Sequence, residues 1–249
     1  MLTEDEKQRY ARHLILEQVG EPGQERLRAG RVLVIGAGGL GSPAAQYLAA
    51  AGVGTIGVAD GDVVELSNLQ RQVIHGTSDL GRQKVLSARD RMLEINPGVR
   101  VEAIGEWLTA DNIGAIVARY DFVLDATDNF DAKFLINDAC VGAGVPFSHG
   151  GILKFQGQTM TVRPRQTTCY RCIFPEPPEP EVVLPCSRAG VLGVLPGVIG
   201  SIQATEALKF LLGIGELLTS RLLTFDLLTM RFREVPLGRN PDCPACGGT

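Results

Sequence analysis

Residues 31–41, RVLVIGAGGLG, join a run of apolar β-type side chains to a glycine-rich turn. Glycines in such a turn permit a tight bend, let a phosphate group approach the backbone and bring the following helix close to the sheet. We expect Ser42 to cap that helix, Pro43 to lie in its first turn and Gly52 to end it. The order of strand, turn and helix predicts a Rossmann-like unit with a phosphate-bearing ligand at the turn.

The ligand at this turn is predicted to be a nucleotide. Asp60 follows a second apolar run, residues 55–59, at the position where an acidic side chain accepts hydrogen bonds from ribose hydroxyls. The alternative is a glycine-rich turn selected only for packing, and the turn alone does not name the nucleotide. The glycines expected to lie nearest the phosphates are Gly36, Gly38, Gly39 and Gly41.

The order of apolar patterns predicts an α/β fold with a mostly parallel sheet flanked by helices. A predicted hairpin over 222–225 and 230–235 adds an antiparallel C-terminal part. We expect a single domain over 1–249, with a nucleotide-binding half over about 30–150. The other expected elements are the helices 81–95, 110–119, 132–143 and 197–212 and the strands 99–104, 122–126 and 158–162.

Composition and charge exclude several classes of protein. The chain has 249 residues, 45% of them hydrophobic, which is enough to bury a sizeable core. A formal net charge of −4 without a basic tract argues against a general nucleic-acid or anionic-membrane binder. No apolar run approaches the length of a membrane span, and the N-terminus MLTEDEKQ is acidic where a secretory signal would be basic. We therefore expect a cytoplasmic protein.

Four of the six cysteines form two CxxC pairs, which predict a metal site. Two thiolates from each pair would complete the tetrahedral S₄ shell of a structural Zn²⁺ ion. The alternative is a thioredoxin-like redox pair, but two such pairs in Pro/Gly-rich turns favour metal. The zinc would tie the C-terminal tail to the middle of the chain. The predicted ligands are Cys169, Cys172, Cys243 and Cys246.

The two remaining cysteines receive different predictions. Cys140 lies in an apolar helical stretch and is expected to be a core residue. Cys186 follows the Pro/Glu-rich stretch 175–185, which is expected to be a mobile loop. On the residues alone, Cys186 is equally a reactive thiol or an incidental exposed cysteine.

Further motifs follow the glycine turn in a specific order. SNLQRQ spans residues 67–72, Lys84 stands at a predicted helix start, LDATDN spans residues 124–129, and the paired cysteines come last. Taken singly, Arg71 and Lys84 would be ordinary solvated side chains. In this order the motifs resemble the ubiquitin-activating-type adenylyltransferase family over nearly the whole chain. The closest resemblance is to the bacterial sulfur-carrier adenylyltransferases of the molybdopterin and thiamine pathways, without a choice between the two.

The resemblance implies Mg-ATP as the nucleotide and the Gly-Gly carboxyl terminus of a ubiquitin-like sulfur carrier as the second substrate. It places Gly39 against the phosphates, Asp60 at the ribose and Asp128 at Mg²⁺. Residues 151–249 would form the carrier-binding half. For Asp128 the alternative is a helix N-cap, because a helical pattern follows. The motif residues assigned to the nucleotide are Ser67, Asn68, Leu69, Gln70, Arg71, Lys84, Asp128 and Asn129.

The implied reaction needs cations and not a general base. A carboxylate is already ionised at neutral pH, so the barrier to its attack on the α-phosphorus is repulsion between two anions. The product would be an acyl-adenylate, which a separate sulfurtransferase or cysteine desulfurase could supply with sulfur. Cys186 matches the cysteine on the family's crossover loop, where members differ in forming a covalent intermediate. His149 replaces a residue that is small in much of the family, and no role is assigned to it.

The N-terminal segment is expected to complete the active site of a second subunit. Thr3 and Glu6 have capping-box spacing, and residues 3–16 are predicted to continue as one amphipathic helix. Arg12 alone would be a solvated helix arginine, but the resemblance implies that it reaches the neighbouring nucleotide site in a homodimer. The residues expected to act in catalysis are Arg12, Arg71, Lys84, Asp128 and Cys186.

Two other classes of function compete with the adenylyltransferase. The first is an NAD-dependent oxidoreductase, although none of His13, His75 and His149 stands in an evident catalytic context. The second is a zinc-stabilised module that senses a nucleotide without catalysis. Carrier-dependent pyrophosphate exchange, a change in NADH fluorescence, and ATP binding without exchange would distinguish the three.

Overall fold

The computed structural model describes residues 1–177 and 189–247. One sheet of eight strands crosses it in the order β3-β2-β1-β4-β5-β6-β7-β8. The first five strands in this order, β3, β2, β1, β4 and β5, are parallel. Strands β6, β7 and β8 continue the sheet in antiparallel pairing. The predicted fold class is confirmed. The strands are β1 Arg31–Ile35, β2 Thr55–Ala59, β3 Arg100–Ile104, β4 Phe122–Asp125, β5 Phe147–Leu153, β6 Gln156–Val162, β7 Arg221–Asp226 and β8 Arg231–Pro236.

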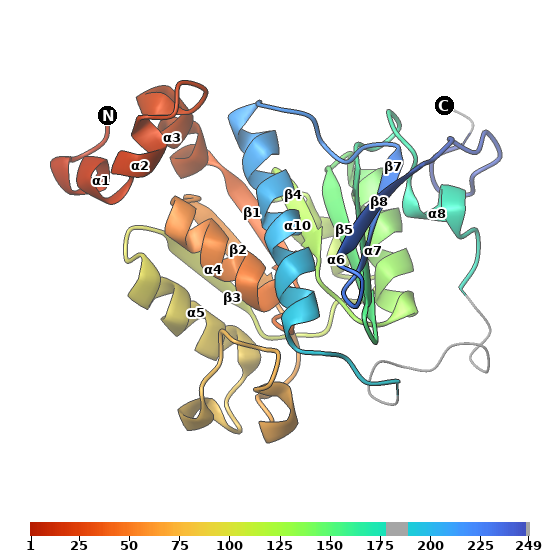
Figure 1. Cartoon of the computed structure of the whole chain (residues 1–249), viewed down its shortest axis with the longest axis horizontal. Coiled ribbons are helices and arrows are strands. Elements are labelled where there is room, and N and C mark those ends of the chain that lie inside the picture. The colour runs from red at the N-terminus through yellow and green to blue at the C-terminus, as the bar shows by residue number, and fades with distance from the viewer. Residues whose placement is uncertain (178–188, 248–249) are drawn as a thin grey trace.

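Helices cover both faces of the parallel part of the sheet (Figure 1). Val32 and Val34 of β1 pack with α4, α5 and α10 on one face, whereas Leu33 and Ile35 pack with α6 and α7 on the other. A strand buried on both faces needs apolar side chains at successive positions, which explains the uninterrupted apolar run. The helices are α1 Glu4–Arg9, α2 Ala11–Leu14, α3 Gly20–Ala29, α4 Gly41–Ala51, α5 Lys84–Ile95, α6 Ile113–Val117, α7 Phe130–Ala143, α8 Tyr170–Ile173 and α10 Val194–Leu212, with 3-10 turns η1 Leu66–Asn68 and η2 Thr77–Asp79.

The strand register brings the predicted motifs to one edge of the sheet. Ile35 at the end of β1 pairs with Ala59 at the end of β2 and with Asp125 at the end of β4. The glycine turn, Asp60 and the segment after β4 therefore leave the sheet side by side. In open α/β sheets, this carboxyl edge is where ligands bind.

Two local predictions near the helix starts are wrong. The expected single N-terminal helix is broken at Tyr10 into α1 and α2, although the capping box between Thr3 and Glu6 is present. Tyr10 is buried, and its hydroxyl accepts a hydrogen bond from Asn96 at 2.8 Å, so a distant contact sets the break. Ser42 does not cap α4, because the helix begins at Gly41, one residue before Ser42. The Ser42 hydroxyl instead donates to the Gly38 carbonyl at 2.6 Å.

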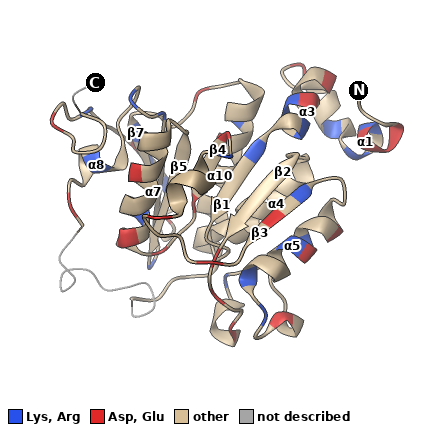
Figure 2. Ribbon diagram, turned by 180° about the vertical axis from the view of Figure 1, so that it is seen from behind, with Lys and Arg blue, Asp and Glu red and all other residues tan. Residues whose placement is uncertain are grey.

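Charged residues of both signs are interspersed along α1, α3 and α5 (Figure 2). Within the described ranges, no helix has both the length and the apolar character needed to cross a bilayer. The loop predicted over 175–185 lies outside the described residues from position 178 onward.

Candidate active site

Two adjoining cavities open at the carboxyl edge of the sheet. The first, here called the turn cavity, has a volume of about 650 Å³ and is lined by the glycine turn and the segments after β2 and β4. The second, the sheet cavity, has a volume of about 760 Å³ and is lined mainly by β5, β6, β7 and β8. Thr127, Asp128, Asn129 and Ile152 line both cavities. These shared residues form a junction where two ligands could meet.

Most of the predicted nucleotide residues lie around the turn cavity. Gly41, Asn68 and Leu69 do not line it. The Asn68 side chain is buried and instead organises the 3-10 turn η1, where its Oδ1 accepts from the Glu65 backbone N–H at 3.2 Å. The lining residues predicted from the sequence are Gly36, Gly38, Gly39, Asp60, Ser67, Gln70, Arg71, Lys84, Asp128 and Asn129.

Gly36 and Gly41 form the turn, and Gly36, Gly38 and Gly39 line the cavity. Gly36 has φ +98°, and a Cβ added at Gly41 would lie 1.8 Å from the Gly36 carbonyl oxygen, so neither position accepts a side chain. Gly38 and Gly39 expose backbone to the turn cavity. No side chain caps α4; the Ser42 N–H donates to the Gly38 carbonyl at 2.9 Å and Pro43 has none, so the Gly41 amide is the one at the helix start left for an anion. The turn fits a phosphate group.

Asp60 joins the end of β2 to the glycine turn. Its Oδ2 accepts from the Ala37 backbone N–H and its Oδ1 from the Asp62 backbone N–H, each at 2.8 Å. Each carboxylate oxygen retains further acceptor capacity, and Asp60 lines the turn cavity. Asp60 can therefore hold the turn in place and still accept a hydrogen bond from a ribose hydroxyl.

Two cationic side chains lie at the rim of the turn cavity, and Arg71 is close to Gly39, where an added Cβ would lie 3.5 Å from its Cγ. The Lys84 ammonium is buried at the start of α5 and pairs with Asp62 Oδ2 at 2.8 Å, while Asp62 itself is half exposed. Arg71 Nη1 donates to the Ser67 carbonyl at 3.0 Å. Both side chains line the turn cavity. They supply the positive charge that a polyphosphate requires.

Asp128 does not cap α7. Asn129 is the N-cap, and its Oδ1 accepts from the Ala132 backbone N–H at 2.9 Å. Asp128 is exposed at the junction of the two cavities. The N-cap alternative for Asp128 is therefore wrong. Its binding of Mg²⁺ stays a prediction.

Several residues around the cavities were missed by sequence reasoning. Trp107 is the one tryptophan of the chain, and its half-exposed ring lines the turn cavity beside Asp60 and Leu108. Its position shortly after β3 was the available signal, because side chains after successive parallel strands share one edge of the sheet. Gln72 also lines the turn cavity, and its Oε1 atom is buried without a hydrogen-bond partner in the described structure.

A buried charged cluster from β4, β5 and α7 lies at the wall of the sheet cavity. Asp125 Oδ2 lies 2.8 Å from His149 Nδ1 and 3.2 Å from the Lys133 ammonium. Lys133 also donates to the carbonyls of Thr127 and Gly150, at 2.8 and 2.6 Å. Burial opposes ionisation of Asp125, but Lys133 and the hydrogen bond from His149 hold its pKa well below the usual value. Burial and the Lys133 charge lower the pKa of His149.

The four cysteines predicted to bind metal come together. Their Sγ atoms all lie within 4.8 Å of one another, and the measured Sγ–Sγ separations are 3.8 Å (Cys169–Cys172), 3.6 Å (Cys169–Cys243) and 3.4 Å (Cys172–Cys246). A tetrahedral shell with Zn–S bonds of about 2.3 Å places sulfur atoms about 3.8 Å apart. The cluster therefore fits a Zn²⁺ ion.

This cluster also supports the sheet cavity. Tyr170 stands between the first two cysteines and lines that cavity, and its ring centroid lies 4.7 Å from that of His149. Cys140 is a buried core residue, as predicted, and burial raises the pKa of its thiol. Cys186 lies outside the described residues.

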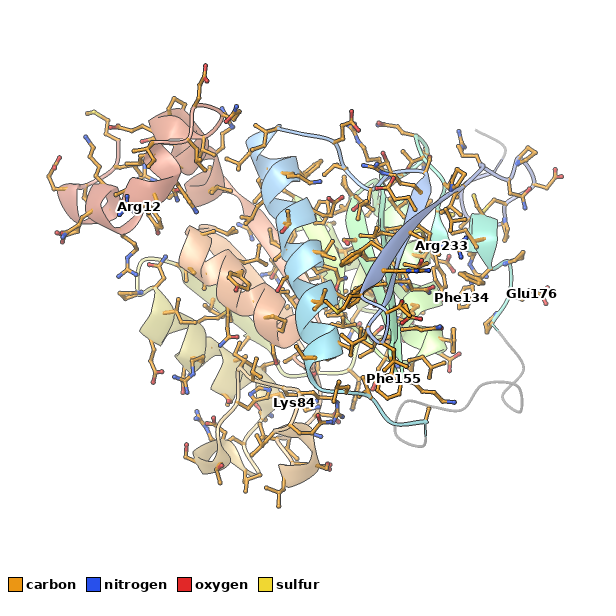
Figure 3. All side chains as sticks on the ribbon, viewed as in Figure 1. Arg12, Lys84, Phe134, Phe155, Glu176 and Arg233 are labelled. Carbon is orange, nitrogen blue, oxygen red and sulfur yellow. The ribbon has the colours of Figure 1, made fainter. Side chains whose placement is uncertain are left out.

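Arg12 is remote from the turn cavity of its own chain. It lies on α2 among the N-terminal helices, well away from Lys84 (Figure 3). The two residues after α2, Ile15 and Leu16, are apolar and exposed, by 73% and 50%. Two exposed apolar side chains therefore follow Arg12 closely in the chain.

Comparisons with known proteins agree with this geometry. The chain matches the ThiF family over residues 10–245. It is 53% identical over 239 residues to the SAMP-activating enzyme E1 of Haloferax volcanii, covering 96% of this chain and 88% of that protein. It is 51% identical over 250 residues to the sulfur carrier protein adenylyltransferase of Thermus thermophilus, covering 98% and 92%. It is also 48% identical to the probable adenylyltransferase/sulfurtransferase MoeZ of Mycobacterium tuberculosis, of which it spans 63%.

The fold also has a counterpart among solved structures. Escherichia coli MccB, crystallised with MccA-N7isoASN, superposes with a TM-score of 0.85 at 22% identity, covering 97% of this chain and 75% of that one. At this identity the likeness concerns the fold alone. Together with the match over residues 10–245, the sequence relatives establish that the chain belongs to the ThiF family.

Proposed function

We propose that this chain uses ATP to adenylylate the C-terminal glycine carboxylate of a ubiquitin-like sulfur carrier, with release of pyrophosphate. The observation that carries the proposal is the junction at Asp128, where a cavity suited to a nucleotide meets a second cavity. The names of the relatives from Thermus thermophilus and Mycobacterium tuberculosis support this activity. The carrier would belong to the molybdopterin or the thiamine pathway.

The turn cavity would hold ATP. The phosphates would lie against Gly38, Gly39 and the uncapped start of α4, where backbone amides and the helix dipole favour an anion. Asp60 would accept a ribose hydroxyl. Lys84 would exchange its ion pair with the exposed Asp62 carboxylate for the triphosphate, and Arg71 would approach from the same rim.

The sheet cavity would receive the glycine tail of the carrier. Its walls come from extended strands, and Lys133, Arg231 and Arg233 outnumber Asp128 and Asp226 in its lining (Figure 3 labels Arg233), so an anionic tail would be attracted into it. Leu153 in the cavity lining and Phe155 and Phe232 outside it expose 42%, 40% and 50% of their surface. These apolar side chains suit the body of a folded protein partner.

The reaction would occur at the junction. The carrier carboxylate is ionised at neutral pH, so a carboxylate oxygen attacks the α-phosphorus directly and pyrophosphate leaves. Arg71 and Lys84 reduce the repulsion between the two anions and orient the phosphates. A Mg²⁺ ion bound by Asp128 would supply further positive charge to the triphosphate.

Zinc, the dimer and the location of the protein complete the proposal. The four cysteines would hold a structural Zn²⁺ ion with no open coordination position. Two chains would form a homodimer in which Arg12 of each reaches the turn cavity of the other. A separate protein would donate the sulfur. We place the protein in the cytoplasm, where thiolates are kept reduced and free to bind metal.

Exchange of labelled pyrophosphate into ATP tests the proposal. We expect exchange that requires both Mg²⁺ and a sulfur carrier with an intact Gly-Gly terminus, and the matched control is the same carrier without its last glycine. ATP binding without exchange would instead support a nucleotide-sensing module. Binding of NADH in preference to ATP would support the oxidoreductase.

A further inference from the structure

One buried polar atom of the sheet cavity has no partner. Among the described residues, His149 Nε2 is buried without any hydrogen bond, and the side chain is only 2% exposed. His149 lines the sheet cavity but not the turn cavity. A buried polar atom costs free energy unless a ligand or water satisfies it. The cavity therefore contains a binding position that the chain itself leaves open.

The surroundings decide which kind of group this position accepts. The Asp125 carboxylate can only accept a hydrogen bond, so the proton of His149 is on Nδ1, 2.8 Å from Oδ2. The Lys133 ammonium contacts the same carboxylate and disfavours a second positive charge on the ring. The ring is therefore neutral, and Nε2 presents a lone pair. This atom requires a donor.

Nε2 is buried close to Gly151 at the wall of the cavity. Gly151 also lines the sheet cavity, and a Cβ added there would lie 3.4 Å from Nε2. Tyr170 packs against the His149 ring and fixes its orientation. Lys133 is already bonded to the carbonyls of Thr127 and Gly150. The Gln158 side-chain amide lies near the same point, 3.3 Å from the added Cβ, but makes no hydrogen bond with Nε2, so this acceptor is left for a donor from the bound molecule or from water.

We propose that His149 Nε2 accepts a hydrogen bond from a backbone N–H of the carrier's glycine tail and thereby sets the register of that tail in the sheet cavity. This inference rests on the proposed function. A glycine offers no side-chain donor, so its amide is the group that this acceptor can recognise. With the tail held at His149, its carboxylate extends toward the junction at Asp128.

Carriers with one amide replaced by an ester test the hydrogen bond. In two semisynthetic carriers, the N–H of the last or the penultimate glycine is replaced by oxygen. For the wild-type protein, we expect one ester to lower kcat/KM for pyrophosphate exchange about tenfold, because a buried acceptor loses its donor. In His149→Phe, which keeps the ring and removes Nε2, exchange with the normal carrier should be similarly weak and the ester should cause no further loss.

Thr127→Val is the control that separates a disturbed Asp125 from the loss of Nε2. Thr127 Oγ1 donates to Asp125 Oδ1 at 2.6 Å, so this variant loses a hydrogen bond to the same carboxylate but keeps Nε2. The ester penalty should persist in Thr127→Val. An equal penalty in wild type and His149→Phe, or no penalty with either ester, would overturn the inference. Absence of exchange by the wild type with the normal carrier would instead overturn the proposed function.

A second measurement needs no variant of the enzyme. The chain has three histidines, and isotope labelling of their ring nitrogens makes Nε2 of His149 observable by NMR. We expect its resonance to move on addition of the normal carrier and to stay in place with one of the two ester carriers. If the resonance responds identically to all three carriers, Nε2 does not accept from the tail. This result decides the inference even if His149→Phe fails to fold.

Discussion

The two cavities are built in different ways. The turn cavity takes its walls from short motifs that directly follow parallel strands, such as the glycine turn after β1 and Asp60 after β2. The sheet cavity is assembled from strands, a short helix and the buried cluster of Asp125, Lys133 and His149, which are far apart along the chain. Damage to the first should impair ATP chemistry directly. Damage to the second should impair carrier binding.

The largest effect is expected from a residue that lies near neither cavity of its own chain. Arg12→Ala should lower carrier-dependent exchange about a thousandfold, because an arginine supplied from a second subunit stabilises the charge of the transition state. Folding and dimer mass should be unchanged. The measurement is exchange rate together with sedimentation.

Complementation shows whether Arg12 acts across the interface. Mixed dimers of Arg12→Ala and Asp128→Ala chains contain one doubly damaged site and one intact site, so part of the activity should return. If mixed dimers form and no activity returns, Arg12 does not reach the partner subunit.

Substitutions in the turn cavity come next. Arg71→Ala, Lys84→Ala and Asp128→Ala should each lower carrier-dependent exchange by roughly a hundredfold, the scale for losing one preorganised charged contact. Cys186→Ala is the control, because adenylation precedes any thiol step and exchange should persist. Loss of exchange in Cys186→Ala would show that the thiol takes part earlier than we propose.

A zinc ligand tests the dependence of the sheet cavity on the cysteine cluster. Cys243→Ser should lower the melting temperature by roughly 10 °C, the shift for a loss of about 3 kcal/mol in a protein of this size. Metal analysis of the wild type should give one zinc per chain. At a temperature where the variant is folded, KM for the carrier should rise more than KM for ATP, since Tyr170 stands between two ligands. Equal increases in the two KM values would contradict a selective dependence of the sheet cavity on the cysteine cluster.

Trp107 gives the smallest effect and the simplest signal. As the one tryptophan of the chain, lining the turn cavity, it should change its fluorescence on addition of ATP and not on addition of carrier alone. Trp107→Ala should weaken ATP binding by about three- to tenfold, the value of one aromatic contact. A fluorescence response to carrier without nucleotide would mean that the carrier binds in the turn cavity, contrary to the proposal.

The sequence predicted what depends on neighbouring residues and missed what depends on distant ones. Strand β2 and the end of α5 at Ile95 were found because apolar period and helix signals are local, although α5 begins at Lys84 and not at the predicted position 81. The break at Tyr10 depends on Asn96, and the contact of His149 with Asp125 joins two strands. Neither contact has a local signal. The sheet cavity therefore became visible only in the folded chain.

The central claim is that the carrier carboxylate attacks the α-phosphorus at the junction of the two cavities. A carrier with heavy oxygen in its terminal carboxylate tests this claim directly. After incubation with ATP and a thiol that cleaves the acyl-adenylate, mass spectrometry measures the oxygen isotope in the released AMP. We predict one heavy oxygen in each AMP, transferred from the carrier. Unlabelled AMP, or ADP as the product, would contradict the claim.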